Sequence, residues 1–149
     1  MKAEGSEMKP VQVIMRIIEG EIALSRGRTT EAISLLQEAV SDVRSNSSSY
    51  FFIESESLAD ALERHGDLQK SVPALERASQ QKAIAYENEG STGQYWLKVQ
   101  WRLAQFYRKL GRTEDAQKLE AELLKTLAYA DPEHPLLLKL TQARTINNW

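Results

Sequence analysis

Apolar residues recur at three- and four-residue steps along most of this chain, and that spacing is typical of α-helices rather than of strands. The clearest run precedes Gly111 and consists of Val99, Leu103, Phe106, Tyr107 and Leu110. The pattern predicts helices throughout and no strand. We expect seven helices, at about residues 9–26, 29–45, 50–65, 68–88, 94–110, 113–129 and 133–144.

A short phrase occurs twice in the chain, with a looser version between the two copies. It reads GRTTEAISL from Gly27, GDLQKSVPAL from Gly66 and GRTEDAQKL from Gly111. Glycine is the usual residue at the end of a helix because it enters the left-handed backbone conformation without steric cost. The polar and acidic residues that follow suit the N-terminus of a new helix. Each phrase therefore predicts a helix, a tight turn and a second helix.

The turn glycines are 39 and 45 residues apart, and repeated helix pairs of about this length are typical of α-solenoids. The segments EGEIALSRGRTTEAISLLQEA, LADALERHGDLQKSVPALERA and LAQFYRKLGRTEDAQKLEAEL resemble the tetratricopeptide repeat (TPR) family. The resemblance implies small residues where the two helices of a hairpin cross. These would be Gly20 with Ala32, Ala59 with Ser71, and Ala104 with Ala116.

The resemblance implies an all-α fold, a right-handed α-α superhelix of three helical hairpins with a C-terminal capping helix. The hairpins would span residues 9–45, 50–88 and 94–129, with the cap at 133–144, in one domain at 9–144 that follows a flexible segment at 1–8. The sequence departs from the family in its longer period, in Ser71 where alanine is expected, and in Glu120 where a bulky apolar residue is common. Long repeats of this kind are similar to segments of bacterial signalling proteins.

Composition restricts the environment and the partners of the chain. Its net charge of -2 provides no basic field for nucleic acid or for an anionic membrane, and it contains no cysteine. The N-terminal apolar run is short and is interrupted by Arg16 and Glu19, so it predicts neither a secretion signal nor a membrane span. We expect a cytoplasmic protein.

The side chains that carry chemistry are few, and we predict no catalytic residue, metal site or cofactor. The two histidines, His65 and His134, stand far apart at expected helix boundaries, and phosphate-binding, metalloprotease and hydrolase motifs are missing. Four carboxylates crowd one predicted helix, where a solvated acidic face is the better interpretation than a metal site. They are Glu54, Glu56, Asp60 and Glu63. We therefore expect a non-enzymatic protein.

In TPR proteins the first helix of each hairpin lines a concave groove, so the resemblance also implies a binding surface. The first hairpin would contribute Ile14, Ile17, Ile18, Glu21 and Leu24, and the second Glu56, Ser57, Asp60, Glu63 and Arg64. The third would contribute Lys98, Trp101, Arg102, Gln105, Arg108 and Lys109. The main hypothesis is a scaffold or regulatory module that binds a protein or peptide, with acidic ligands preferred at the third hairpin.

Two alternatives remain open for this surface. The charges could be an ordinary solvated face over a packed Trp101, or the groove could be the site of a sensory domain for a small ligand. A closed apolar pocket among Ile17, Leu24 and the second repeat would favour the ligand sensor.

The first predicted helix has apolar residues around most of its circumference, and such a helix is expected to be buried on more than one side. Its candidates for a self-association or partner face are Val11, Ile14, Met15, Ile18 and Ile22. A terminal solenoid unit normally has a polar outer face. We therefore expect a homodimer through this helix, a further repeat before it, or a partner that covers it.

Overall fold

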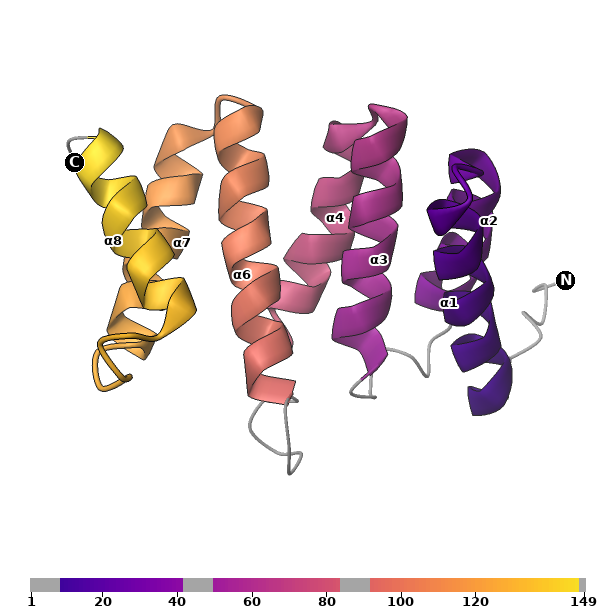
Figure 1. Cartoon of the computed structure of the whole chain (residues 1–149), viewed down its shortest axis with the longest axis horizontal. Coiled ribbons are helices and arrows are strands. Elements are labelled where there is room, and N and C mark those ends of the chain that lie inside the picture. The colour runs from indigo at the N-terminus through magenta and orange to yellow at the C-terminus, as the bar shows by residue number, and fades with distance from the viewer. Residues whose placement is uncertain (1–8, 42–49, 84–91, 148–149) are drawn as a thin grey trace, which may run out of the picture. The chain divides into compact units, whose positions relative to one another are not determined.

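The computed structural model describes residues 9–41, 50–83 and 92–147, and within these ranges it contains seven helices and no strand. The helices are α1 (Pro10–Ser25), α2 (Thr29–Ser41), α3 (Tyr50–His65), α4 (Leu68–Ser79), α6 (Thr92–Lys109), α7 (Thr113–Thr126) and α8 (Pro135–Asn147) (Figure 1). The predicted all-α class is confirmed. Residues 1–8, and the predicted helix ends at 42–45 and 84–88, lie outside the described residues.

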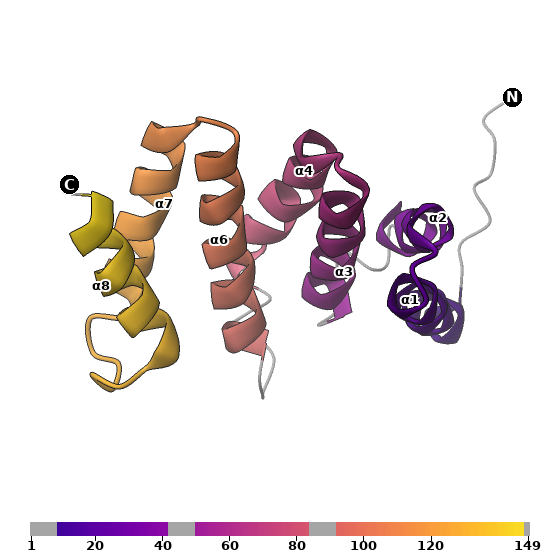
Figure 2. The ribbon, with the colours of Figure 1, turned by 45° about the horizontal axis from the view of Figure 1, so that its top comes forward.

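The three repeated glycines end helices in the way that the phrase predicts. Gly27, Gly66 and Gly111 have φ values of 74°, 90° and 76°, in the left-handed region that favours glycine. After α3 the chain turns tightly: the Gly66 N–H donates to the Glu63 carbonyl and the Asp67 N–H to the Leu62 carbonyl. In both ribbon views α1 therefore lies beside α2, and α3 beside α4 (Figures 1 and 2).

The small residues predicted at the hairpin crossings are buried. Gly20 lies so close to Leu36 of α2 that an added Cβ would be 2.6 Å from the Leu36 Cγ. In the second hairpin the Ser71 hydroxyl donates to the Ala59 carbonyl over 3.4 Å, so the serine that departs from the family bonds across its own crossing. Ala32, Ala104 and Ala116 are likewise buried. All six predicted crossing residues are thus buried, and contacts across the crossing are present in the first two hairpins.

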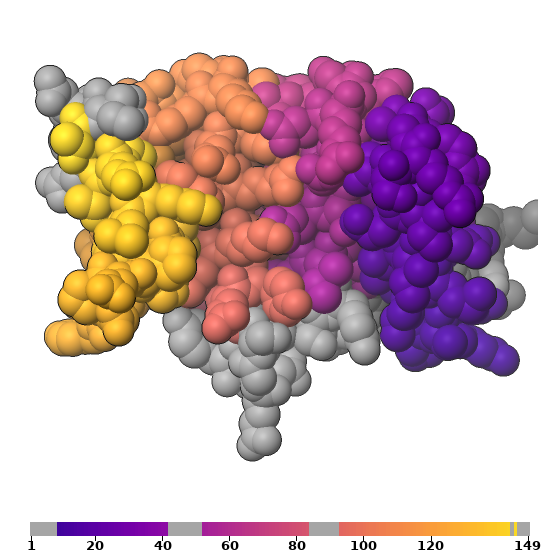
Figure 3. All heavy atoms as spheres, in the orientation of Figure 1, coloured from indigo at the N-terminus to yellow at the C-terminus, as the bar shows by residue number. Residues whose placement is uncertain are grey.

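The chain divides into two compact units, Met1–Val99 and Gln100–Trp149, and the border falls inside α6. The single domain expected over residues 9–144 stays a prediction. In the first unit, side chains of both hairpins share one apolar cluster, in which Leu24 and Leu36 meet Leu58 and Leu62. Figure 3 shows the atoms of α3 directly against those of α1 and α2.

One further contact joins the two hairpins of the first unit. The Arg77 guanidinium of α4 donates through Nη2 to the Val40 carbonyl of α2 over 2.9 Å. Val40 lies in the last described turn of α2. A side chain of the second hairpin is thus hydrogen-bonded to the backbone of the first.

Several predicted helix boundaries are wrong, and α7, for example, ends at Thr126 instead of residue 129. The helix expected over 68–88 stops at Ser79, and the Ser79 carbonyl accepts a hydrogen bond of 2.9 Å from the indole N–H of Trp96. The last helix begins at Pro135 instead of residue 133, because the Asp131 carboxylate accepts the Glu133 N–H and holds a turn there. His134 Nδ1 accepts the Leu136 N–H over 3.3 Å, so this histidine caps the helix as its position suggested.

Candidate protein-binding surface

Six of the predicted binding residues lie on α6, and their spacing places them on one face of that helix. They are Lys98, Trp101, Arg102, Gln105, Arg108 and Lys109, and we call them the α6 face. The buried positions of α6, such as Val99 and Leu103, fall on the opposite side. Lys98, Gln105 and Lys109 are exposed, whereas Trp101, Arg102 and Arg108 are partly exposed. The six residues thus share one face of α6, with Lys98 in the first unit and the other five in the second.

Lys98 pairs with an acidic residue of α3 inside the first unit. Its ammonium lies 2.8 Å from a carboxylate oxygen of Glu56, and the two side chains are 62% and 11% exposed. Nearby on α3, Asp60 pairs with Arg64 over 2.8 Å. The predicted groove has acidic residues on α3 and basic residues on α6. Ion pairs inside the first unit compensate part of the negative charge of α3.

Arg108 forms a bidentate ion pair with Glu120 of α7. Its Nε donates over 2.8 Å to Oε1 of the carboxylate and its Nη2 donates over 2.6 Å to Oε2. Glu120 is 1% exposed, so this pair explains how a carboxylate occupies a position where an apolar residue is common. The hydrogen bonds to Glu120 raise the pKa of Arg108, with burial opposing them. Much of the Arg108 charge is thus compensated within the second unit.

Two other cations of the α6 face are held over an aromatic ring. The Arg102 guanidinium lies 5.4 Å and the Lys109 ammonium 5.8 Å from the centre of the Phe106 ring, which is itself buried. Such cation–π contacts hold the charged groups near the surface and orient them. The α6 face thereby presents positive charge next to the partly exposed Trp101.

Several predicted positions are not on an exposed surface. The sequence places Ile17 and Leu24 toward a groove, but both are buried in apolar clusters of the first unit. It places Glu54 and Glu56 on a solvated acidic face, and this interpretation is wrong because both are buried. The reason is that α3 packs against α1, α2 and α4 together, which leaves little of its circumference for water.

Asp60 and Glu63 remain partly exposed on α3. In the described parts of the chain no three metal-binding side chains come together.

The first helix carries the largest group of exposed apolar side chains. Val11, Met15, Ile18 and Ile22 are 59%, 53%, 52% and 42% exposed, whereas Ile14 is partly buried. Sequence reasoning identifies these residues from the apolar circumference of the helix. No helix among the described residues is both long and apolar enough to cross a membrane.

Comparisons with known proteins identify the fold. The chain resembles structures of nearly identical TPR-like repeats assigned to a putative kinesin light chain of Podosopora anserina. One, of a single-substitution variant, has a TM-score of 0.69 and 25% identity, and the match covers 95% of this chain and 69% of the other. A second has a TM-score of 0.65 and 23% identity, with 94% and 69% covered. No family model and no curated protein matches the sequence. The chain thus has a TPR-like repeat fold.

Proposed function

We propose that this chain is a non-catalytic protein-interaction module whose α6 face binds an acidic segment of a partner protein. The TPR-like fold supports an interaction module in general, because α-solenoids present extended surfaces for binding. The preference for an acidic partner rests on α6 itself.

The observation that carries this proposal is the charge of α6. The helix Thr92–Lys109 contains four basic residues and no acidic residue, although the chain as a whole has a net charge of -2. All four basic side chains belong to the α6 face, beside Trp101. Two of them, Lys98 and Arg108, are already paired with carboxylates of the chain, and an acidic segment would compete with those carboxylates. Arginine and tryptophan are enriched among the residues that dominate binding energies at protein interfaces. An acidic segment with an apolar anchor would match this combination.

A fluorescence anisotropy titration would test this function. The probe is a fluorescein-labelled peptide of glutamates around one leucine, and the reference peptide has glutamine at every glutamate. We expect the acidic peptide to bind more tightly, and its affinity to fall as salt rises because exposed charges are screened over about 10 Å at 0.1 M.

Variants then locate the site. Trp101→Ala should weaken binding by about tenfold or more, since interface tryptophans often contribute above about 1.4 kcal/mol. Lys118→Gln and Lys125→Gln remove cations from α7 and serve as controls that should bind as the unchanged protein does. Equal binding of both peptides, or full binding by the Trp101 variant, would refute the proposed site.

The small-ligand sensor has no support of its own. A closed apolar pocket among Ile17, Leu24 and the second repeat would favour it, but those two side chains are packed in apolar clusters. The cytoplasmic location, and a role as a scaffold or regulatory segment of a bacterial signalling protein, stay predictions from the sequence. The two similar structures are of a putative kinesin light chain of Podosopora anserina, and they do not test either prediction.

A further inference from the structure

The exposed side chains Val11, Met15, Ile18 and Ile22 form one continuous row on α1, which we call the α1 stripe. The buried residues of the same helix, among them Val13, Ile17 and Gly20, point to the opposite side. The stripe is therefore the outer surface of the first hairpin. Four large apolar side chains in one row make a patch of the kind that marks an interface.

The equivalent surface of the second hairpin, on α3, is covered by a neighbouring helix. Thirty-nine residues later, the positions of Met15, Ile18 and Ile22 are occupied in α3 by Glu54, Ser57 and Ala61. Those three residues are 0%, 8% and 0% exposed.

Ala61 belongs to the cluster that α3 shares with α2 of the preceding hairpin. In this fold, the face that α1 leaves bare is thus one that packs against another helix.

The spacing of the stripe indicates which helix would cover it. Its members follow one another by four, three and four residues, which is the alternation of the two core positions in a coiled coil. Ser25 continues the row by three more. A helix with the same spacing fits such a row side by side, and a second copy of α1 has that spacing by definition.

The charges beside the stripe set the direction of such a pair. In a parallel coiled coil, a residue on one flank meets the residue five positions later in the partner helix. Glu21 and Arg26 have this separation, and both are exposed. A parallel, two-fold symmetric pair of α1 helices would therefore contain two Glu21–Arg26 ion pairs. In an antiparallel pair centred on the stripe, these two side chains would be separated by about 20 Å along the helices.

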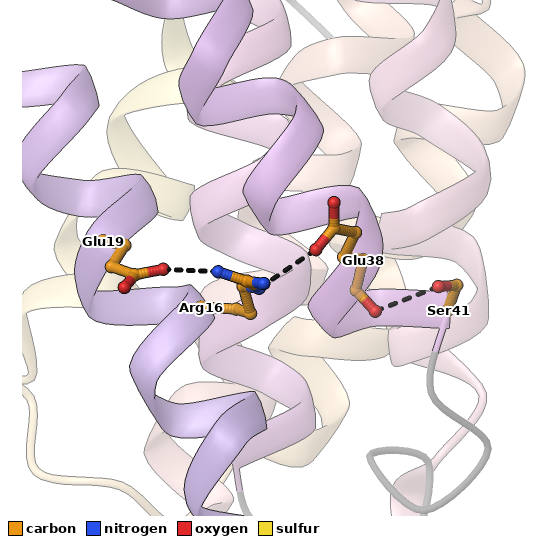
Figure 4. A network of polar contacts seen from close by, with 4 residues as sticks. All are labelled: Arg16, Glu19, Glu38 and Ser41. Carbon is orange, nitrogen blue, oxygen red and sulfur yellow. Dashed lines mark hydrogen bonds and ion pairs between the residues drawn. The ribbon is translucent and has the colours of Figure 1, made fainter. Parts of the chain in front are cut away.

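The remaining charges near the stripe are already satisfied within one chain. Arg16 lies 2.8 Å from Glu19 and 3.0 Å from Glu38 of α2, and Ser41 donates to the Glu38 carbonyl (Figure 4). This network ties α1 to α2 and compensates the carboxylate of Glu19, which stands on the other flank of the stripe. In the helix pair, the flank that carries Glu19 would therefore not present an uncompensated carboxylate to the partner helix.

We propose that two copies of this chain associate through their α1 stripes as a parallel, two-fold symmetric helix pair. The surface is separate from the α6 face, so failure of one proposal leaves the other standing. The seam is short, with four large apolar side chains from each copy. We expect a dimer that forms in the micromolar range and dissociates on dilution.

Sedimentation velocity across a dilution series tests the association. Ile18→Glu places a carboxylate in the centre of the seam, and should raise the dissociation constant of the dimer by at least about thirtyfold. Leu138→Glu is the matched control, because Leu138 is a similarly exposed apolar residue, at 48%, on α8. It should leave the dimer unchanged. Circular dichroism should show the same helix content in both variants.

A second pair of experiments tests the direction. The chain has no cysteine, so Ser25→Cys introduces a single thiol at the end of the stripe. Mild oxidation should link the two copies in a parallel pair, whereas in an antiparallel pair the thiols would be about 25 Å apart. Glu21→Arg should weaken the dimer by about tenfold, and adding Arg26→Glu should restore it.

A concentration-dependent dimer that Ile18→Glu dissociates, that Ser25→Cys crosslinks and that the charge swap restores would support the proposal. A monomer at all concentrations, or a dimer indifferent to Ile18→Glu, would overturn it. A dimer that Ile18→Glu dissociates but Ser25→Cys does not crosslink would overturn the parallel arrangement.

Discussion

Replacing Arg108 by methionine should destabilise the second unit, because it leaves the Glu120 carboxylate buried without its principal partner. The methionine keeps an unbranched apolar stem, so the packing along α6 changes little. What is lost is the bidentate pair, with its hydrogen bonds of 2.8 and 2.6 Å. The perturbation therefore tests chiefly the ion pair between α6 and α7.

The magnitude follows from the burial of the two partners. Removing one member of a buried ion pair costs about 3–5 kcal/mol, whereas an exposed pair is worth about 0–1 kcal/mol. Glu120 is 1% exposed, but the Arg108 side chain is 24% exposed, so water can reach one end of the pair. We therefore expect a loss near the lower limit, about 3 kcal/mol.

Urea denaturation at neutral pH, followed by circular dichroism, measures this loss. With a slope of about 2 kcal/mol per molar urea, the midpoint should fall by about 1.5 M. Because the pKa of Arg108 in the folded chain is raised, its stabilising charge is present at every lower pH and is lost only above that pKa. Neutral pH is therefore a safe condition for the comparison.

A control and a double variant separate burial from charge. Arg28→Met removes the guanidinium of an exposed pair with Glu31, whose side chains are 47% and 48% exposed, and should cost at most about 1 kcal/mol. Arg108→Met combined with Glu120→Leu should return to within about 1 kcal/mol of the original stability, since an apolar pair can replace a buried ion pair. If Arg108→Met costs no more than Arg28→Met, the reasoning from burial is refuted.

Two further predictions concern the first and second hairpins. Gly20→Ala should destabilise the chain by about 1–2 kcal/mol in the same urea assay, since the new Cβ would meet the buried Leu36 and the clash outweighs the better helix propensity; a more stable variant would contradict this. The hydrogen bond from Lys70 holds the pKa of Asp67 below its ordinary value, so any stabilisation from this pair is present at neutral pH and is lost as pH falls through the folded pKa. Lys70→Gln should raise the Asp67 pKa in an NMR titration, and an unchanged value would show that the contact does not persist in solution.

Local chemistry makes most of the fold predictable from the sequence. A glycine with positive φ after an apolar run is a property of a few neighbouring residues, and all three such turns are predicted correctly. The bounds of α3 are predicted correctly for the same reason, since Gly66 fixes its end. The end of α4 escapes prediction because the hydrogen bond from Trp96 to Ser79 depends on residues 17 positions apart.

The candidate surface is harder to predict than the fold. Helical spacing places Lys98 and Arg102 on one face, but it does not show that Glu56 on another helix lies beside Lys98. The burial of Glu54 escapes prediction because periodicity cannot tell how many neighbours surround a helix. The α1 stripe is easier to find, since apolar residues around a whole circumference exceed what one packing face can cover.

The hydrogen bond from Arg77 to Val40 couples the local unfolding of the two hairpins of the first unit. If α4 detaches, α2 loses the hydrogen bond to its Val40 carbonyl although no residue of its own hairpin has changed. Amide exchange near the end of α2 should therefore accelerate in step with the opening of the second hairpin. A destabilising substitution in the second hairpin would then also destabilise the first. The two hairpins would therefore unfold cooperatively rather than one at a time.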